Sequence, residues 1–65
     1  MDPIILASAR SLASQWEHLG EAKCADQIVL HLESEFPEDG DQAQIIACVE
    51  HVIEEVFPIP APIFA

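Results

Sequence analysis

Two histidines each precede a glutamate by four residues, a spacing that could serve a metal ion. His31 with Glu35, and His51 with Glu55, would each share one face of a helix. Facing pairs on antiparallel helices could then hold zinc or iron. However, the Glu-x-x-His spacing of carboxylate-bridged bundle sites is missing, and a His–Glu pair on an exposed helix face is usually solvated. The sequence therefore predicts no metal and no cofactor, and these pairs are the candidates to test.

The segment Asp39-Gly40-Asp41 invites comparison with a calcium-binding loop, in which oxygen ligands surround a central glycine. With Gly40 at the sixth position of such a loop, Ile46 would stand where a bidentate glutamate is required, and Pro37 would replace the ligand at position 3. The coordination sphere cannot be completed. We therefore expect a turn followed by a helix cap.

Catalysis by a nucleophile or by paired carboxylates has little support. The chain has no G-x-S-x-G motif, and neither Cys24 nor Cys48 has a histidine placed by sequence to activate it. Three short helices rarely enclose the cleft that shifts the pKa values of paired carboxylates. We expect that the protein is not an enzyme.

The cysteines and the first residues bear on the compartment. Cys24 and Cys48 are 24 residues apart and belong to no Cys-x-x-Cys or Cys/His cluster, which favours free, partly buried thiols in a reducing cytosol. Met1 is followed by Asp2 and Pro3 rather than by a basic region, and the apolar stretch 4–7 is only four residues long. These features predict a cytoplasmic protein without a signal peptide or membrane span.

Charge is the most distinctive property of the chain. Its 65 residues include 12 Asp and Glu against 2 Lys and Arg, for a formal net charge of −10. This excess excludes nucleic-acid binding through phosphate contacts, which require basic side chains. Hydrophobic residues make up 51% of the chain, which is too apolar for intrinsic disorder. We expect one domain, whose core or partner chain must offset the self-repulsion.

The acids gather in two clusters along the sequence. Residues 33–41 contain five of them, and residues 50–55 contain three more. Several fall near the carboxyl ends of predicted helices, where a negative charge costs roughly 0.3–1 kcal/mol. We predict that they extend one negative face that binds a partner; a solvated surface that serves only solubility is the alternative. The predicted partner-binding residues are Glu33, Glu35, Glu38, Asp39, Asp41, Glu50, Glu54 and Glu55.

Apolar residues recur every three or four positions in three segments, at about 3–19, 21–36 and 42–57. This is the period of amphipathic helices, and short connections force neighbouring helices to be antiparallel. The predicted fold class is all-α, a small three-helix bundle. Its core-facing positions are Ile5, Ala9, Leu12, Trp16 and Leu19, then Ala25, Ile28, Val29, Leu32 and Phe36, then Ile45, Ile46, Val49, Val52, Ile53, Val56 and Phe57.

Capping and stop signals mark the boundaries of these segments. Asp2 is placed to cap the first helix, and Gly20 to end it. Pro37 ends the second helix, because the residue before a proline avoids the helical conformation. Asp41, with Gln44 three residues later, predicts a capping box at the start of the third helix.

Residues 58–65 carry no charged side chain and contain three alternate prolines. Proline favours an extended course, so we predict an extended, Pro-rich apolar C-terminal tail that packs on the bundle or on a partner. Tryptophan is a common anchor in interfaces where it is not part of a core. The possible hydrophobic interface comprises Trp16, Phe57, Ile59, Ile63 and Phe64.

In size, acidity and helical build, the chain resembles small phage-encoded anti-CRISPR and DNA-mimic proteins. The resemblance implies a viral inhibitor that occupies the basic surface of a nucleic-acid-binding protein or effector complex, without itself binding nucleic acid or a membrane. No motif carries the resemblance, so no residue role is transferred from it. The alternative function is a homodimeric helical adapter or regulator that uses Trp16 and the apolar tail as its interface.

Overall fold

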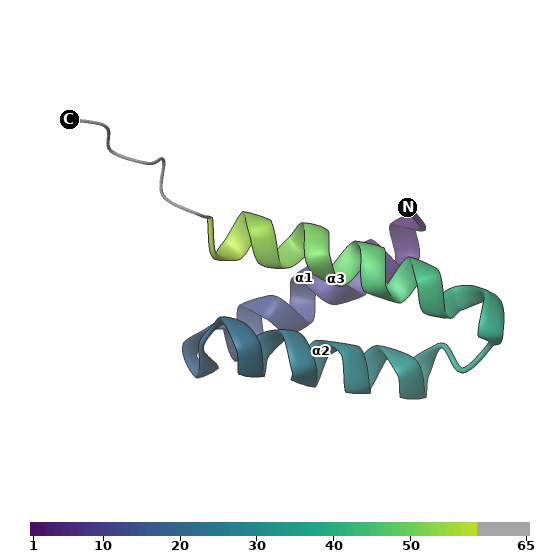
Figure 1. Cartoon of the computed structure of the whole chain (residues 1–65), viewed down its shortest axis with the longest axis horizontal. Helices are drawn as coiled ribbons and strands as arrows, with labels where there is room; N and C mark the ends of the chain where they lie inside the picture. The colour runs from purple at the N-terminus through teal and green to yellow at the C-terminus, as the bar shows by residue number, and fades with distance from the viewer. Residues whose placement is uncertain (59–65) are drawn as a thin grey trace.

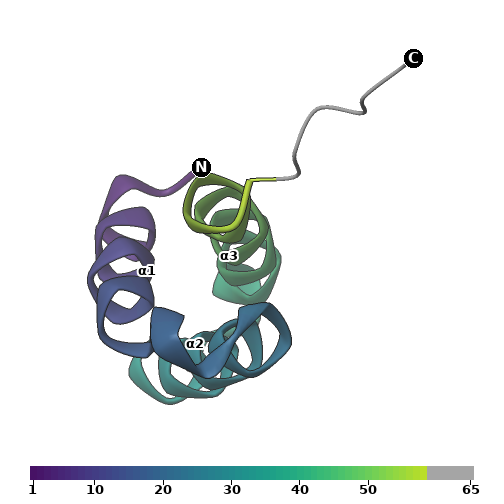
Figure 2. The ribbon, with the colours of Figure 1, turned by 90° about the vertical axis from the view of Figure 1, so that its left-hand side faces the viewer.

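The computed structural model describes residues 1–58, which contain the helices α1 (Pro3–Trp16), α2 (Glu21–Glu35) and α3 (Gln42–Val56). Short 3-10 turns at Glu17–Leu19 and Asp39–Asp41 precede α2 and α3. Successive helices run antiparallel, and each of the three contacts the other two (Figures 1 and 2). The predicted all-α three-helix bundle is therefore confirmed. Except for Pro58, the predicted tail (residues 58–65) lies outside the described residues.

The start of α1 follows the predicted capping chemistry. Asp2 has an extended backbone, and its carboxylate accepts hydrogen bonds from the backbone N–H groups of Ile4, at 2.9 Å, and Ile5, at 3.4 Å. Pro3 takes the first helical position, where its missing N–H removes no helical hydrogen bond. Asp2 thus satisfies two of the donors that every helix N-terminus leaves free.

The end of α1 comes three residues earlier than the predicted Leu19. Residues 17–19 tighten into a 3-10 turn, and the Gly20 N–H donates to the Glu17 carbonyl at 3.2 Å. Gly20 has φ 94° and ψ 163°, a region that is essentially restricted to glycine. This conformation allows α2 to begin immediately at Glu21 and to run back along α1. Leu19, predicted to face the core, is 39% exposed because the tighter turn carries it away from the apolar stripe.

Gly20→Ala is expected to destabilise the protein by about 1–3 kcal/mol, the usual cost of a non-glycine residue in this conformation. No atom lies within 4 Å of a Cβ added at Gly20, so the cost comes from the backbone alone. Gly40→Ala is the matched control, because Gly40 has no positive φ and equally open surroundings. Urea unfolding of both variants measures the difference. Equal stability of the two variants would contradict the assigned role of Gly20.

The ends of α2 and α3 share one backbone arrangement. Phe36 and Phe57 each precede a proline and leave the helical region, with φ −124° and ψ 76° for Phe36 and φ −121° and ψ 68° for Phe57. The steric effect of proline on the preceding residue accounts for both stops. The predicted boundaries of α2 and α3 are therefore correct to within one residue.

The predicted capping box at the start of α3 is wrong. Asp41 is already helical, and its side chain makes no capping hydrogen bond. An N-cap side chain reaches the first helical N–H groups from an extended backbone, which Asp41 lacks because it closes a 3-10 turn. Gln44 instead accepts a hydrogen bond from the backbone N–H of Asp2 at 2.9 Å, and this bond ties the start of α1 to α3.

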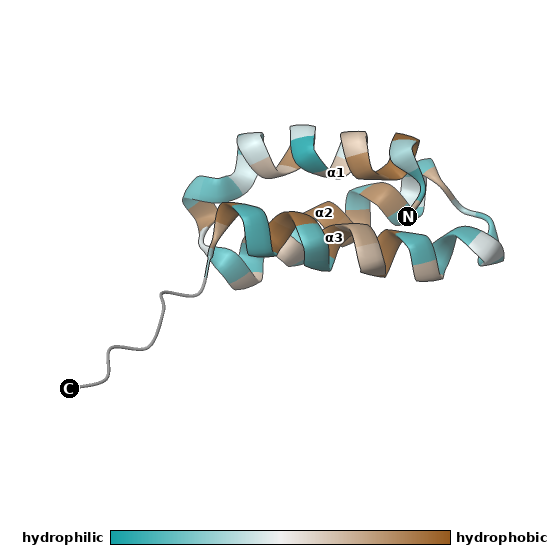
Figure 3. Cartoon of the chain, turned by 90° about the horizontal axis from the view of Figure 1, so that it is seen from above, coloured by the Kyte–Doolittle hydropathy of each residue, from teal (hydrophilic) through white to brown (hydrophobic). Residues whose placement is uncertain are grey.

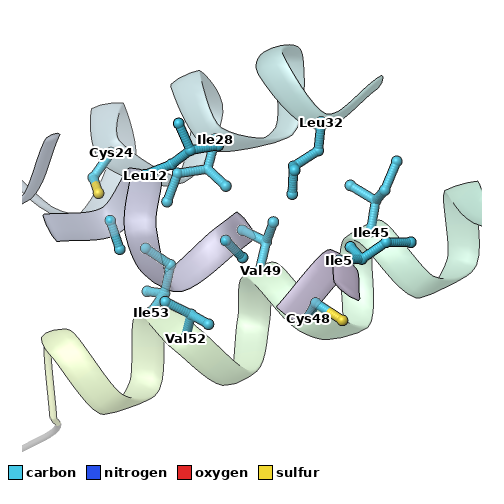
Figure 4. Packing of buried hydrophobic residues seen from close by; sticks show 12 residues of the cluster. Ile5, Leu12, Cys24, Ile28, Leu32, Ile45, Cys48, Val49, Val52 and Ile53 are labelled. Atoms are coloured by element: carbon cyan, nitrogen blue, oxygen red, sulfur yellow. The ribbon is translucent and has the colours of Figure 1, made fainter. Parts of the chain in front are cut away.

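The core lies between the three helices and contains only apolar and thiol side chains (Figure 4). The thiol side chains of Cys24 and Cys48 are fully buried in separate parts of this core, whereas the sequence predicted only partial burial. Ile46 was predicted to face the core but is 49% exposed, because it follows Ile45 by about 100° around α3 and only one of the two can point inward. The buried residues are Ile5, Ala9, Leu12, Ala13, Cys24, Ile28, Leu32, Ile45, Cys48, Val49, Val52 and Ile53.

Candidate partner-binding surface

The eight predicted partner-binding acids are accessible in the folded chain. Seven of them are exposed, and Asp41 is half-buried. Hydropathy colouring also shows hydrophilic residues at the connection between α2 and α3 (Figure 3). The acids can therefore meet another molecule, but the helices divide them among different sides of the bundle.

Three of the acids gather around a hollow at the connection between α2 and α3. The hollow has a volume of about 230 Å³, and Glu33, Glu38 and Asp39 contribute its negative charge. Glu33 stands in the last turn of α2, where the helix dipole disfavours a carboxylate. The remaining lining residues are Phe36, Pro37, Gln42 and Ile45.

The charges at this hollow have no internal compensation. Within residues 1–58, Glu33, Glu38 and Asp39 make no ion pair and no side-chain hydrogen bond. Of the two basic side chains, Arg10 is paired with another acid and Lys23 stands in the first turn of α2, at the opposite end of that helix. Within residues 1–58, the hollow therefore presents carboxylates that have no ion-pair partner.

Glu35 lies on a different side of α2 from Glu33. Its carboxylate is 3.2 Å from the Nε2 atom of His31, and the His31 ring meets the ring of Trp16 edge-on at 5.9 Å between centroids. This contact places the pair on the side of α2 that faces α1. Residues two apart on a helix are separated by about 200°, so the run of acids in the sequence does not become one continuous face.

The exposed carboxylate of Glu55 is paired with two basic side chains of the bundle, Arg10 and His51. Arg10 donates hydrogen bonds from Nε and Nη2 to the two carboxylate oxygens, at 3.2 and 2.9 Å, and His51 Nε2 lies 2.9 Å from Oε1. These interactions, with Arg10 the largest contributor, hold the pKa of Glu55 below its usual value. Glu55 therefore links α1 to α3. The sequence had placed it among the partner-binding residues and did not predict this internal contact.

Glu55→Gln is expected to destabilise the protein at pH 7 and to have less effect at pH 3. A carboxyl whose pKa is lowered in the folded state contributes stability above its unfolded pKa, and this contribution is lost as the pH falls through the folded value. Urea unfolding at both pH values measures it. Glu54→Gln is the control, because it removes an exposed charge from the same turn without breaking an ion pair. Equal destabilisation by the two variants at pH 7 would contradict the assignment.

Glu50 and Glu54 form a second exposed acidic site on α3. They are four residues apart and so share one face, where like charges repel modestly. Glu54 stands in the last turn of α3, at the opposite end of that helix from the Asp39–Asp41 turn. The two acidic clusters therefore lie toward opposite ends of the bundle.

The predicted hydrophobic interface is only partly described. Trp16 and Phe57 are half-buried and pack against the core. Ile59, Ile63 and Phe64 lie outside the described residues. The sequence did not single out Ile4 and Leu30, which are 67% and 60% exposed, because each looks like an ordinary apolar residue next to a helical stripe.

The candidate metal ligands form pairs rather than a larger cluster. The predicted contacts of His31 with Glu35 and of His51 with Glu55 are both present, at 3.2 and 2.9 Å. Among residues 1–58, no group of three or more His, Cys, Asp or Glu side chains is arranged to hold a metal ion. Cys24 and Cys48 are free, and burial raises the pKa of both thiols. Thiols of this kind are weak nucleophiles at neutral pH.

Sequence reasoning found the acids but missed the hollow. Its apolar lining comes from Phe36 and Pro37 at the end of α2 and from Ile45 in the first turn of α3. The available signal was the proline stop, since it turns the chain sharply beside the densest run of acids.

In the part of the chain that the structure describes, no helix has the length and apolar character needed to cross a membrane. Comparison with protein-family models, curated proteins and solved structures gives no match to this chain.

Proposed function

We propose that this protein is a small, non-enzymatic acidic binding protein that inhibits a nucleic-acid-binding protein or complex by occupying its basic surface. The observation that supports this proposal most strongly is the group Glu33, Glu38 and Asp39, which is exposed, gathered at one hollow and uncompensated within residues 1–58. Opposite charges on two surfaces steer their encounter and select the partner. This mode of action is also what the resemblance to anti-CRISPR and DNA-mimic proteins implies.

The lining of the hollow supports binding rather than catalysis. It offers carboxylates, one amide and apolar groups, but no imidazole, thiol, hydroxyl or amine side chain. Carboxylates can act as bases in an enclosed cleft that shifts their pKa values, whereas these three are exposed at the surface. The two thiols that could act as nucleophiles are buried in the core instead.

The proposal also accounts for how the chain uses its two basic side chains. Arg10 is committed to Glu55, where it joins α1 to α3. The acids at the hollow are left free, although a lysine or arginine nearby would relieve their repulsion. A binding surface for cationic groups requires this arrangement, because an internal partner would compete with the external one.

Capture followed by competition tests the proposal. The tagged chain is used as bait in an extract of its native cell, and each captured protein is then purified and assayed for nucleic-acid binding with and without the chain. We expect one captured protein to lose its nucleic acid when the chain is added, and its affinity for the chain to fall steeply as salt rises from 50 to 500 mM. The proposal is overturned if no captured protein binds nucleic acid, or if the chain and the nucleic acid bind together.

The homodimeric adapter is a distinct outcome of the same study. Sedimentation of the purified chain would then give a tight dimer whose association does not change with salt. Trp16 and Phe57, which this alternative uses as anchors, are already half-buried against the chain's own core. A salt-insensitive dimer that ignores nucleic-acid-binding proteins would replace the inhibitor proposal.

A further inference from the structure

We draw no further inference here: the strongest candidate, the outward surface patch of α1 around Ile4, which is 67% exposed on a helix that carries no acidic side chain, is an unpartnered helix face, and nothing in the structure of residues 1–58 shows what covers it.

Discussion

Replacing Leu32 by alanine is expected to lower the free energy of unfolding by about 2–5 kcal/mol, a large part of the protein's total stability. Leu32 is completely buried on α2 and belongs to the cluster that joins all three helices (Figure 4). Truncating a buried leucine to alanine costs about 2–5 kcal/mol, from lost burial and from the cavity that remains. A chain of this length is expected to have a total stability of only about 3–10 kcal/mol, so the substitution removes much of it.

Leu30→Ala is the matched control for this prediction. Leu30 lies two residues away on the same helix, but it is 60% exposed. Its truncation should change stability by less than about 0.5 kcal/mol, as is usual for surface positions. Urea unfolding followed by circular dichroism measures both variants. If Leu30→Ala costs as much as Leu32→Ala, the assigned core is wrong.

Neutralising the acids of the hollow is expected to weaken partner binding by about 100-fold without unfolding the protein. The variant combines Glu33→Gln, Glu38→Gln and Asp39→Asn. Three lost charge pairs at about 0.9 kcal/mol each, near the upper limit for exposed pairs, sum to about 2.7 kcal/mol, which corresponds to this change in affinity. The folded state should tolerate the change, because these exposed side chains make no ion pair within residues 1–58. Titration calorimetry with the captured partner at 100 mM salt measures it.

The control for this second prediction carries Glu17→Gln, Glu21→Gln and Asp26→Asn. It has the same net charge but keeps the acids of the hollow, so it should bind within about threefold of the wild type. Equal losses in the two variants would mean that overall charge, rather than the hollow, determines affinity. If the first variant binds the partner as tightly as the wild type, these three acids are not part of the interface.

Local signals predicted the helices because each depends on a few neighbouring residues. Asp2 caps α1, and Pro37 and Pro58 stop α2 and α3, through contacts that need no tertiary structure. The capping box at Asp41 failed because the preceding 3-10 turn had already fixed its backbone as helical. The prediction that Ile46 faces the core was wrong because α3 carries more apolar residues than its core-facing side can bury.

The candidate surface was predictable in composition but not in arrangement. The sequence shows which positions are acidic, but neighbouring positions diverge around a helix, and this separates Glu33 from Glu35. The pairing of Glu55 with Arg10 joins residues 45 apart, and no periodicity in the sequence points to it. The hollow likewise depends on how α3 packs beside the end of α2. These features require tertiary contacts that a single sequence does not encode as a local pattern.

A structure of the chain bound to its captured partner tests the central claim most directly, namely that the uncompensated carboxylates at the α2–α3 connection bind cationic groups of another macromolecule. The account predicts lysine or arginine side chains of the partner within hydrogen-bond distance of Glu33, Glu38 and Asp39, in the site that nucleic acid otherwise occupies. An interface formed by Ile4, Leu30 or other apolar residues, with these three carboxylates directed into solvent, would contradict it.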